Sequence, residues 1–259
     1  MTNDTTGTTT TPTRARRRPG VLVPVLVAAA AAALTLVVAL ASASTGGEDT
    51  GSAGASSTAA PSGEGDQKAR DAAQRAWEQL ARRTPNDPLA MGKVDAPVVM
   101  VAYSEFQCPF CGKFARDTEP TLVKKFVDQG TLRIEWRDFP YLGPESTTAA
   151  HGGRAAAAQG KFWAFHDALF ADPAPVNGGK LTPAYLAGVA KDLGLDVVRF
   201  SQDLSSPQTA AAVQQDFKEG QSIGVTGTPA FLINGEPIIG AQPTATFVAA
   251  VERAAAAAR

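Results

Sequence analysis

The stretch Phe106-Gln107-Cys108-Pro109-Phe110-Cys111 decides how the rest of this 259-residue chain is interpreted. It holds both cysteines of the sequence and follows an apolar run at residues 98–102. A run of this kind predicts a buried strand of a parallel sheet. Proline suits the first position of a helix, because its missing N–H would have no partner there. The stretch therefore predicts a strand-to-helix junction, with Cys108 at the helix N-terminus and Cys111 one turn further in.

The predicted position of Cys108 has a chemical consequence. Free backbone N–H groups and the positive end of the helix dipole stabilise an anion at a helix N-terminus. We therefore expect the pKa of Cys108 to be lowered, and the thiolate is the reactive form of cysteine. Cys111 should be less exposed and close enough to form a disulfide with Cys108. These two residues are the predicted catalytic pair.

Three alternatives compete for the two cysteines. A Cys-x-x-Cys spacing is also half of a zinc site, but such sites need about four ligands, and only His151 and His166 could complete this one. A purely structural disulfide would be an unusual use of so short a loop, because the stabilisation by a cross-link grows with loop length. Two unreactive core cysteines are the third alternative, against which Pro109 at the helix start argues. We expect no metal here.

The N-terminal part of the chain resembles a membrane-targeting region. Residues 1–20 are predicted to be a disordered cytoplasmic tail that ends in a cluster of arginines. The apolar run at residues 21–41 spans roughly 30 Å as a helix, which matches a bilayer core. By the positive-inside rule it is a single-pass signal-anchor in the cell membrane, with the N-terminus cytoplasmic and all later residues extracytoplasmic. The alternative is a cleaved signal peptide, for which Ala41-Ser42-Ala43 offers a site.

Two segments connect this run to the globular part. Residues 42–66 are rich in Ser, Gly, Thr and Ala and lack Lys and Arg, so they are predicted to form a flexible linker. Residues 67–83 carry apolar residues at helical spacing, which predicts an amphipathic helix. In that helix Trp77 and Leu80 either dock on the globular domain or form a dimer contact. The net charge of −1 does not indicate a basic surface for binding nucleic acid.

The globular domain is predicted over residues 88–258. A strand at residues 97–106, a helix at 109–128 and a strand at 131–139 form a right-handed βαβ unit. In the second strand, apolar residues alternate with Arg133, Glu135 and Arg137, which predicts one buried and one open face.

A helical insertion follows over residues 145–221, with Gly194 and Gly220 as predicted helix ends. Within it, the aromatic neighbours of His166 indicate packing rather than catalysis. Asn234-Gly235 then predicts a hairpin, and a closing helix is expected over residues 243–258.

Together these features resemble the DsbA-like family of thiol-disulfide oxidoreductases. That family has an α/β thioredoxin-like fold, a central mixed sheet flanked by helices, with an inserted helical subdomain. The matching positions are Gly92, residues 96–98, residues 105–111, Trp163, Phe165, His166, Leu169, Phe170, residues 224–229, Phe231, Asn234, Gly235 and Gly240.

The resemblance implies roles for several residues. Pro229 is expected to be a cis proline packed against Cys108, and Thr228 to present its backbone to a bound substrate strand. Pro109 and Phe110 support the cysteine motif. One departure is that thioredoxins commonly bury an acid six residues before the first cysteine, where this chain has Ala102. Glu105 is nearer to the cysteines but lies elsewhere on the strand, and we assign it no role.

The resemblance also implies an activity and partners. The chain is expected to introduce disulfides into cysteine-containing exported proteins, with a membrane redox partner that recycles its active-site disulfide. No cofactor is expected beyond that redox-active disulfide. One alternative is a reductase or isomerase that uses the same pair, and another is a membrane-tethered binding or holdase module. Titration of the pair against glutathione separates these functions.

Overall fold

The computed structural model of this protein describes residues 64–258. The predicted tail, the predicted anchor and nearly all of the predicted linker lie outside the described residues. Within the described range, none of the helices combines the length and the apolar character needed to cross a bilayer.

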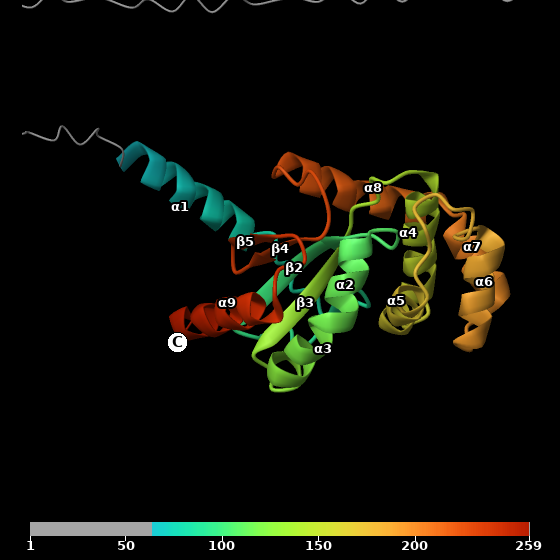
Figure 1. Ribbon diagram of the computed structural model, residues 1–259, viewed down its shortest axis with the longest axis horizontal. Coiled ribbons are helices and arrows are strands. Elements are labelled where there is room, and N and C mark those ends of the chain that lie inside the picture. Colours follow the sequence, from blue (N-terminus) through green and yellow to red (C-terminus); the bar gives the residue numbers. More distant parts are fainter. Residues whose placement is uncertain (1–63, 259) are drawn as a thin grey trace, which may run out of the picture. The chain divides into compact units, whose positions relative to one another are not determined.

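A five-stranded mixed sheet forms the centre of the described domain (Figure 1). Its strands are β1 (Ala90–Met91), β2 (Val98–Ser104), β3 (Leu132–Asp138), β4 (Ala230–Ile233) and β5 (Glu236–Ile239), in the spatial order β1-β3-β2-β4-β5. Strands β2 and β3 are parallel, and every other pair is antiparallel. The crossover between β2 and β3 runs through α2 (Pro109–Asp117), α3 (Glu119–Leu122) and a π-helical turn, η1 (Val123–Val127). The predicted βαβ unit and the predicted mixed sheet are therefore confirmed.

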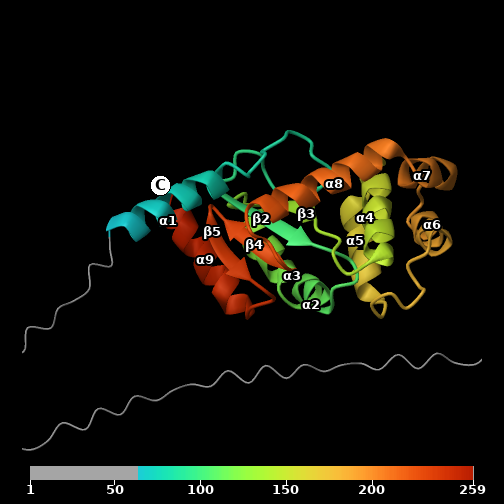
Figure 2. The same cartoon turned by 90° about the horizontal axis from the view of Figure 1, so that it is seen from above.

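Helices cover both faces of this sheet. Figure 2 shows α2, α3 and α9 (Thr244–Ala257) on one side, and α8 (Pro207–Ser222) with α1 (Glu64–Glu78) on the other. The two faces of β2 alternate accordingly: Met100 packs toward α2 and α9, whereas Val101 packs toward α8 and the end of α1. A strand buried on both faces explains why the run at residues 98–102 is apolar throughout.

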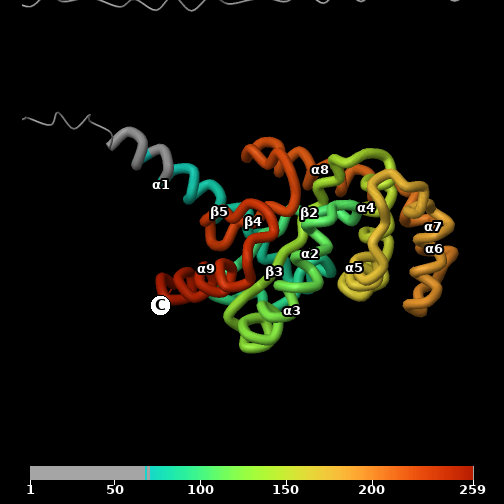
Figure 3. The backbone as a smooth tube through the Cα atoms, viewed as in Figure 1, coloured from blue at the N-terminus to red at the C-terminus, as the bar shows by residue number. Residues whose placement is uncertain are grey.

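The predicted helical insertion leaves the sheet after β3 and returns before β4, a path that Figure 3 traces. It consists of α4 (Pro144–Ala157), α5 (Phe162–Ala171), α6 (Pro183–Asp192), α7 (Val197–Leu204) and α8. Its core contains Phe162, Phe165, Leu186 and Phe200, and it continues into Phe106 beside the cysteines. The insertion therefore packs directly against the strand-to-helix junction.

Gly220 does not end a helix as predicted, because α8 continues to Ser222. A Cβ atom on Gly220 would lie 2.8 Å from a ring carbon of Phe139 and 3.0 Å from one of Tyr103. The glycine is needed for this close approach of α8 to the sheet. The helix stop lies at Gly224, whose φ of +87° favours glycine.

The prediction that one face of β3 is open to solvent is wrong. All seven residues of β3 are buried. Glu135 accepts hydrogen bonds from Arg133 at 2.9 Å and from Arg137 at 3.0 Å, and also from the backbone N–H groups of Arg82 and Arg83. Periodicity could not reveal this arrangement, because the charges pair with one another and Glu135 also accepts backbone hydrogen bonds from a segment about fifty residues earlier in the chain.

The amphipathic helix predicted over residues 67–83 corresponds to α1, which begins and ends a few residues earlier. Trp77 and Leu80 were expected either to dock on the globular domain or to form a dimer contact, and in the structure they dock on the domain. Both pack against the sheet face formed by Val99, Val101 and Tyr103.

Candidate active site

The strand-to-helix junction places the two cysteines as the sequence predicts. Cys108 is the N-cap of α2, with φ −71° and ψ 118°, and Pro109 occupies the first helical position. The Cys108 sulfur accepts a hydrogen bond from the backbone N–H of Cys111 at 3.3 Å. Both cysteines are free thiols and are buried, so this is the dithiol form of the pair.

The two thiols differ strongly in acidity. A hydrogen bond from the Cys111 thiol is the largest cause that lowers the pKa of Cys108, to about 6, and the backbone N–H groups of Cys111 and Phe110 add to it. Burial, followed by the interaction with Cys108, raises the pKa of Cys111 well above its ordinary value. The lowered pKa of Cys108 agrees with our expectation. The largest cause differs from the expected one, because the hydrogen bond from the neighbouring thiol contributes more than those from the backbone N–H groups at the helix start.

The loop before β4 completes the surroundings of Cys108. The peptide bond between Thr228 and Pro229 is cis, as expected. The Cys108 thiol donates a hydrogen bond to the carbonyl oxygen of Thr228 at 3.3 Å. The ring centroids of Phe114 on α2 and Phe231 on β4 lie 4.4 Å apart and hold the two elements together. Residues 120 positions apart in sequence thus meet at one sulfur atom.

Exposed aromatic side chains lie beside these buried groups. Phe110, between the two cysteines, is 63% exposed, and Tyr141 is 41% exposed. The Tyr141 hydroxyl lies 3.7 Å from where a Cβ atom on Gly227 would stand, one residue before Thr228.

Glu105, which the sequence analysis left without a role, lies in a buried polar network behind the cysteines. Its carboxylate accepts hydrogen bonds from the Ser146 hydroxyl at 2.5 Å and from the Gln107 N–H at 3.1 Å. Burial raises the pKa of Glu105 to about 7. No local sequence pattern around Glu105 predicts this hydrogen-bond network, because Ser146 lies 41 residues away in the chain.

His166 on α5 lies among aromatic side chains, as the sequence predicts. His166 is buried, and its ring packs against Phe170 and Trp136 with centroids 4.8 and 5.4 Å away. Its Nδ1 lies 2.9 Å from Asp167 and its Nε2 lies 3.9 Å from Glu119. Within residues 64–258, these three side chains are the group whose ligand atoms lie close enough to hold a metal ion. The two imidazole nitrogens face different carboxylates, which is the arrangement of an internally paired structural histidine.

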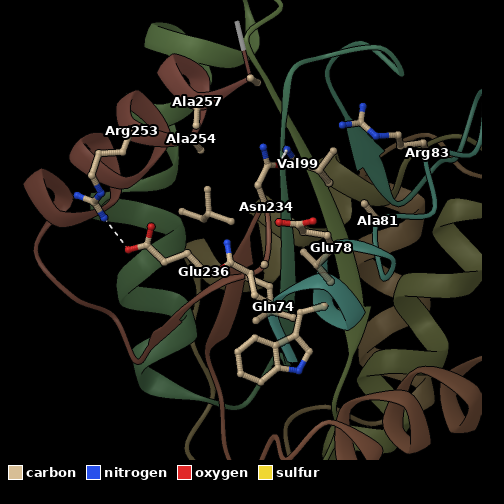
Figure 4. A pocket seen from close by; sticks show the side chains of 16 residues that line it. Gln74, Glu78, Ala81, Arg83, Val99, Asn234, Glu236, Arg253, Ala254 and Ala257 are labelled. Atoms are coloured by element: carbon tan, nitrogen blue, oxygen red, sulfur yellow. Dashed lines mark hydrogen bonds and ion pairs between the residues drawn. The ribbon is translucent and has the colours of Figure 1, made fainter. Parts of the chain in front are cut away.

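A cavity of about 480 Å³ lies between α1, α9 and the β4–β5 hairpin. Figure 4 shows Arg253 and Glu236 pointing toward each other at its edge, where they form an ion pair of 2.6 Å. None of the predicted site residues lines this cavity. The candidate active site is therefore the cysteine pair with the loop before β4.

Comparison with known proteins agrees with this geometry. The profile of the family Thioredoxin_4, described as thioredoxin, matches residues 84–253. The probable disulfide bond formation protein D of Bacillus cereus is 30% identical over 150 residues, which cover 56% of this chain and 69% of that protein. The Na(+)/H(+) antiporter NhaA 3 of Salinispora tropica is 36% identical over 177 residues, which cover 68% of this chain. The match spans just 26% of the antiporter's length.

Solved structures show the same architecture. Oxidised BdbD from Bacillus subtilis has a TM-score of 0.61 and 25% sequence identity, with 66% of this chain and 94% of that chain covered. The α-DsbA1 of Wolbachia pipientis has a TM-score of 0.62 and 22% identity, with 70% and 96% covered. Both likenesses support a thioredoxin-like sheet with inserted helices.

Proposed function

We propose that this chain, which belongs to the thioredoxin family and has a DsbA-like fold, is a thiol-disulfide oxidoreductase that introduces disulfides into exported proteins. The observation that carries the proposal is the asymmetry of the pair. Cys108 has a pKa of about 6, whereas the pKa of Cys111 is raised by burial. The sulfur of Cys108 is thus suited to exchange with a substrate, and the sulfur of Cys111 is suited to break and re-form the internal disulfide.

The proposed reaction transfers two electrons from the substrate to the enzyme disulfide. A substrate thiolate attacks the sulfur of Cys108, the bond between Cys108 and Cys111 breaks, and Cys111 leaves with the electron pair and takes a proton. The second substrate thiolate then attacks the substrate sulfur of the mixed disulfide, and Cys108 leaves as a thiolate. A low pKa makes Cys108 a good leaving group and stabilises the reduced enzyme, which makes the enzyme more oxidising.

The remaining roles follow from this reaction. Thr228 and Pro229 dock the substrate strand beside Cys108, and the exposed Phe110 contacts it. The pair itself is the redox group, so no bound cofactor takes part. A membrane redox partner accepts the two electrons and restores the disulfide. Residues 21–41 anchor the chain in the membrane with the catalytic domain outside, where protein disulfides persist.

Trapping tests the proposal directly. Cys111→Ser removes the resolving sulfur, so mixed disulfides between Cys108 and exported cysteine-containing proteins should accumulate and disappear on reduction. Cys108→Ser is the matched control and should trap none. If Cys111→Ser captures no partner in its native envelope while the purified variant is folded, the proposal fails. A membrane-tethered binding module would then replace it.

The direction of the reaction is tested by equilibration with glutathione. An oxidase holds its pair reduced at potentials where a reductase holds it oxidised. The isomerase alternative would gain support from α1 acting as a dimer contact. Trp77 and Leu80 instead pack against the sheet of their own domain, so no observation favours it over the oxidase.

A further inference from the structure

We propose that Glu105 is a positioning residue that acts through Cys108. The carboxyl of Glu105 binds a proton when the dithiol forms and releases it when the disulfide returns. The proposal rests on the proposed function, because it concerns the same pair of cysteines. Glu105 is not at the position where thioredoxins commonly bury an acid, since that position is Ala102 in this chain.

The backbone of Glu105 is part of the turn that holds Cys108. Glu105 follows the last residue of β2, and its carbonyl oxygen accepts a hydrogen bond from the Cys108 N–H at 3.4 Å. The residue is 1% exposed. Its carboxyl is therefore kept out of water, and it lies close enough to Cys108 for the charge of that sulfur to raise its pKa.

The hydrogen bonds around this carboxyl run in one direction. The Asn177 N–H donates to Gln107 Oε1 at 2.5 Å, and Gln107 Nε2 donates to Ser146 Oγ at 2.8 Å. Ser146 Oγ must then donate its own hydrogen to Glu105 Oε2. The network thus supplies Oε2 with two donors, the second being the Gln107 N–H.

The second carboxylate oxygen has no such support. Glu105 Oε1 is buried and has no hydrogen-bond partner within residues 64–258, and no ion pair to Glu105 occurs there. A buried carboxylate that no cation balances favours its neutral form. Burial accordingly raises the pKa of Glu105 to about 7, hydrogen bonds from Ser146 and Gln107 oppose this, and the Cys108 charge adds to it. From the elements packed around it, α4 and the α5–α6 loop contribute the uncharged Ser146 and Asn177, so Cys108 is the titratable group that acts on it.

The coupling to Cys108 fixes the direction of proton movement. Oxidation of two substrate thiols supplies two electrons and two protons to the enzyme. Cys111 binds one proton, and Cys108 remains a thiolate near neutral pH. The new negative charge favours the protonated form of Glu105, which takes up the second proton. When the disulfide returns, that charge disappears and Glu105 releases its proton.

Coupling between two sites is reciprocal. An ionised Glu105 therefore disfavours the Cys108 thiolate by the same factor by which the thiolate disfavours ionised Glu105. As pH rises through the pKa of Glu105, the ionised carboxyl destabilises the Cys108 thiolate, and the reduced enzyme becomes less stable relative to the disulfide form. The enzyme should become a weaker oxidant above that pH than it would be without the carboxyl.

The test is the equilibrium of the purified chain with glutathione, measured across pH. In Glu105→Gln, a side chain of the same shape keeps the acceptor for Ser146 but carries no titrating group. Its equilibrium constant for reduction should rise by about tenfold per pH unit through neutrality, because one proton is released for every two electrons. The wild type should rise less steeply near pH 7, where Glu105 titrates. At about pH 8 the variant should be reduced more readily by about fivefold or more, the lower range of typical coupling between sites.

Ser146→Ala is the matched variant, because it keeps the carboxyl and removes a hydrogen bond that lowers the pKa of Glu105. In this variant, the pH range over which the equilibrium constant for reduction rises less steeply should move to higher pH. Ultraviolet absorbance of the Cys108 thiolate gives a second readout, in which Glu105→Gln should remove any second step near pH 7. A merely structural role for Glu105 would change stability and leave these pH profiles parallel.

Parallel profiles for the wild type and both variants would overturn the inference. If that result came with successful trapping by Cys111→Ser, the inference would fail and the proposed function would stand. Failure of trapping would instead overturn the proposed function, whatever the glutathione profiles show.

Discussion

The hydrogen bond between the two sulfurs predicts a difference between two substitutions of Cys111. Cys111→Ala removes the donor that most lowers the pKa of Cys108, whereas Cys111→Ser keeps a hydroxyl donor in the same place. Both variants remove the resolving sulfur and both leave the backbone N–H groups at the helix start. The pair therefore separates the effect of the neighbouring thiol from that of the helix N-terminus.

The size of the effect follows from the type of hydrogen bond. A hydrogen bond to a charged group contributes about 1.5–3 kcal/mol, which is about 10- to 140-fold in the acid dissociation constant of Cys108. Half of Cys108 is thiolate near pH 6 in the wild type. In Cys111→Ala the thiolate fraction at that pH should be lower by roughly 6- to 70-fold.

The assay is the rate of alkylation of Cys108 as a function of pH. The midpoint of this profile is the quantity to compare, because a more basic thiolate is also intrinsically more nucleophilic and regains part of the rate. Cys111→Ser should titrate near the wild type, and Cys111→Ala at clearly higher pH. Equal midpoints for the two variants would refute the reasoning. The helix N-terminus would then be the main cause of the low pKa.

Two further predictions concern the fold and the topology. Gly220→Ala should lower the Tm, because the added Cβ meets Phe139 and overpacking costs about 1–3 kcal/mol. The control Gly188→Ala, where a Cβ meets nothing within 4 Å, should raise the Tm by a few degrees as alanine gains up to about 1 kcal/mol in a helix; an equal rise for both would contradict the close approach of α8. For the predicted anchor, a reporter fused after the last residue should be extracytoplasmic and the chain should resist carbonate extraction at full size. A soluble product that begins near Ser44 would instead identify residues 21–41 as a cleaved signal.

Local sequence patterns predicted much of this fold because their physical causes are local. Asn234 and Gly235 have φ values of +44° and +84°, which is the geometry that an Asn-Gly hairpin turn requires. Pro109 likewise fixes the start of α2 beside Cys108. These features depend on neighbouring residues, so the sequence contains their full cause.

Other features that depend on distant residues could not be predicted from local patterns. The burial of Glu135 depends on backbone N–H groups of another segment, at Arg82 and Arg83, and Gly220 is explained by ring atoms of Phe139 and Tyr103. The network of Glu105 depends on Ser146, which the insertion brings to the active site. From sequence alone Glu135 suggested a solvated charge, Gly220 suggested a helix stop and Glu105 had no assigned role, because the partners of these residues become visible only in three dimensions.

The distance along the chain between Cys108 and Thr228 has a consequence for biogenesis. The carbonyl group that contacts the reactive sulfur lies 120 residues later in sequence, beyond the whole helical insertion. Chains emerge from the ribosome N-terminus first, and contacts of large sequence separation form late. The cysteine pair is therefore synthesised well before the loop that shapes its surroundings. A partly made chain therefore has both thiols before Thr228 and Pro229 exist, and the surroundings of Cys108 are complete only when β4 pairs with β2.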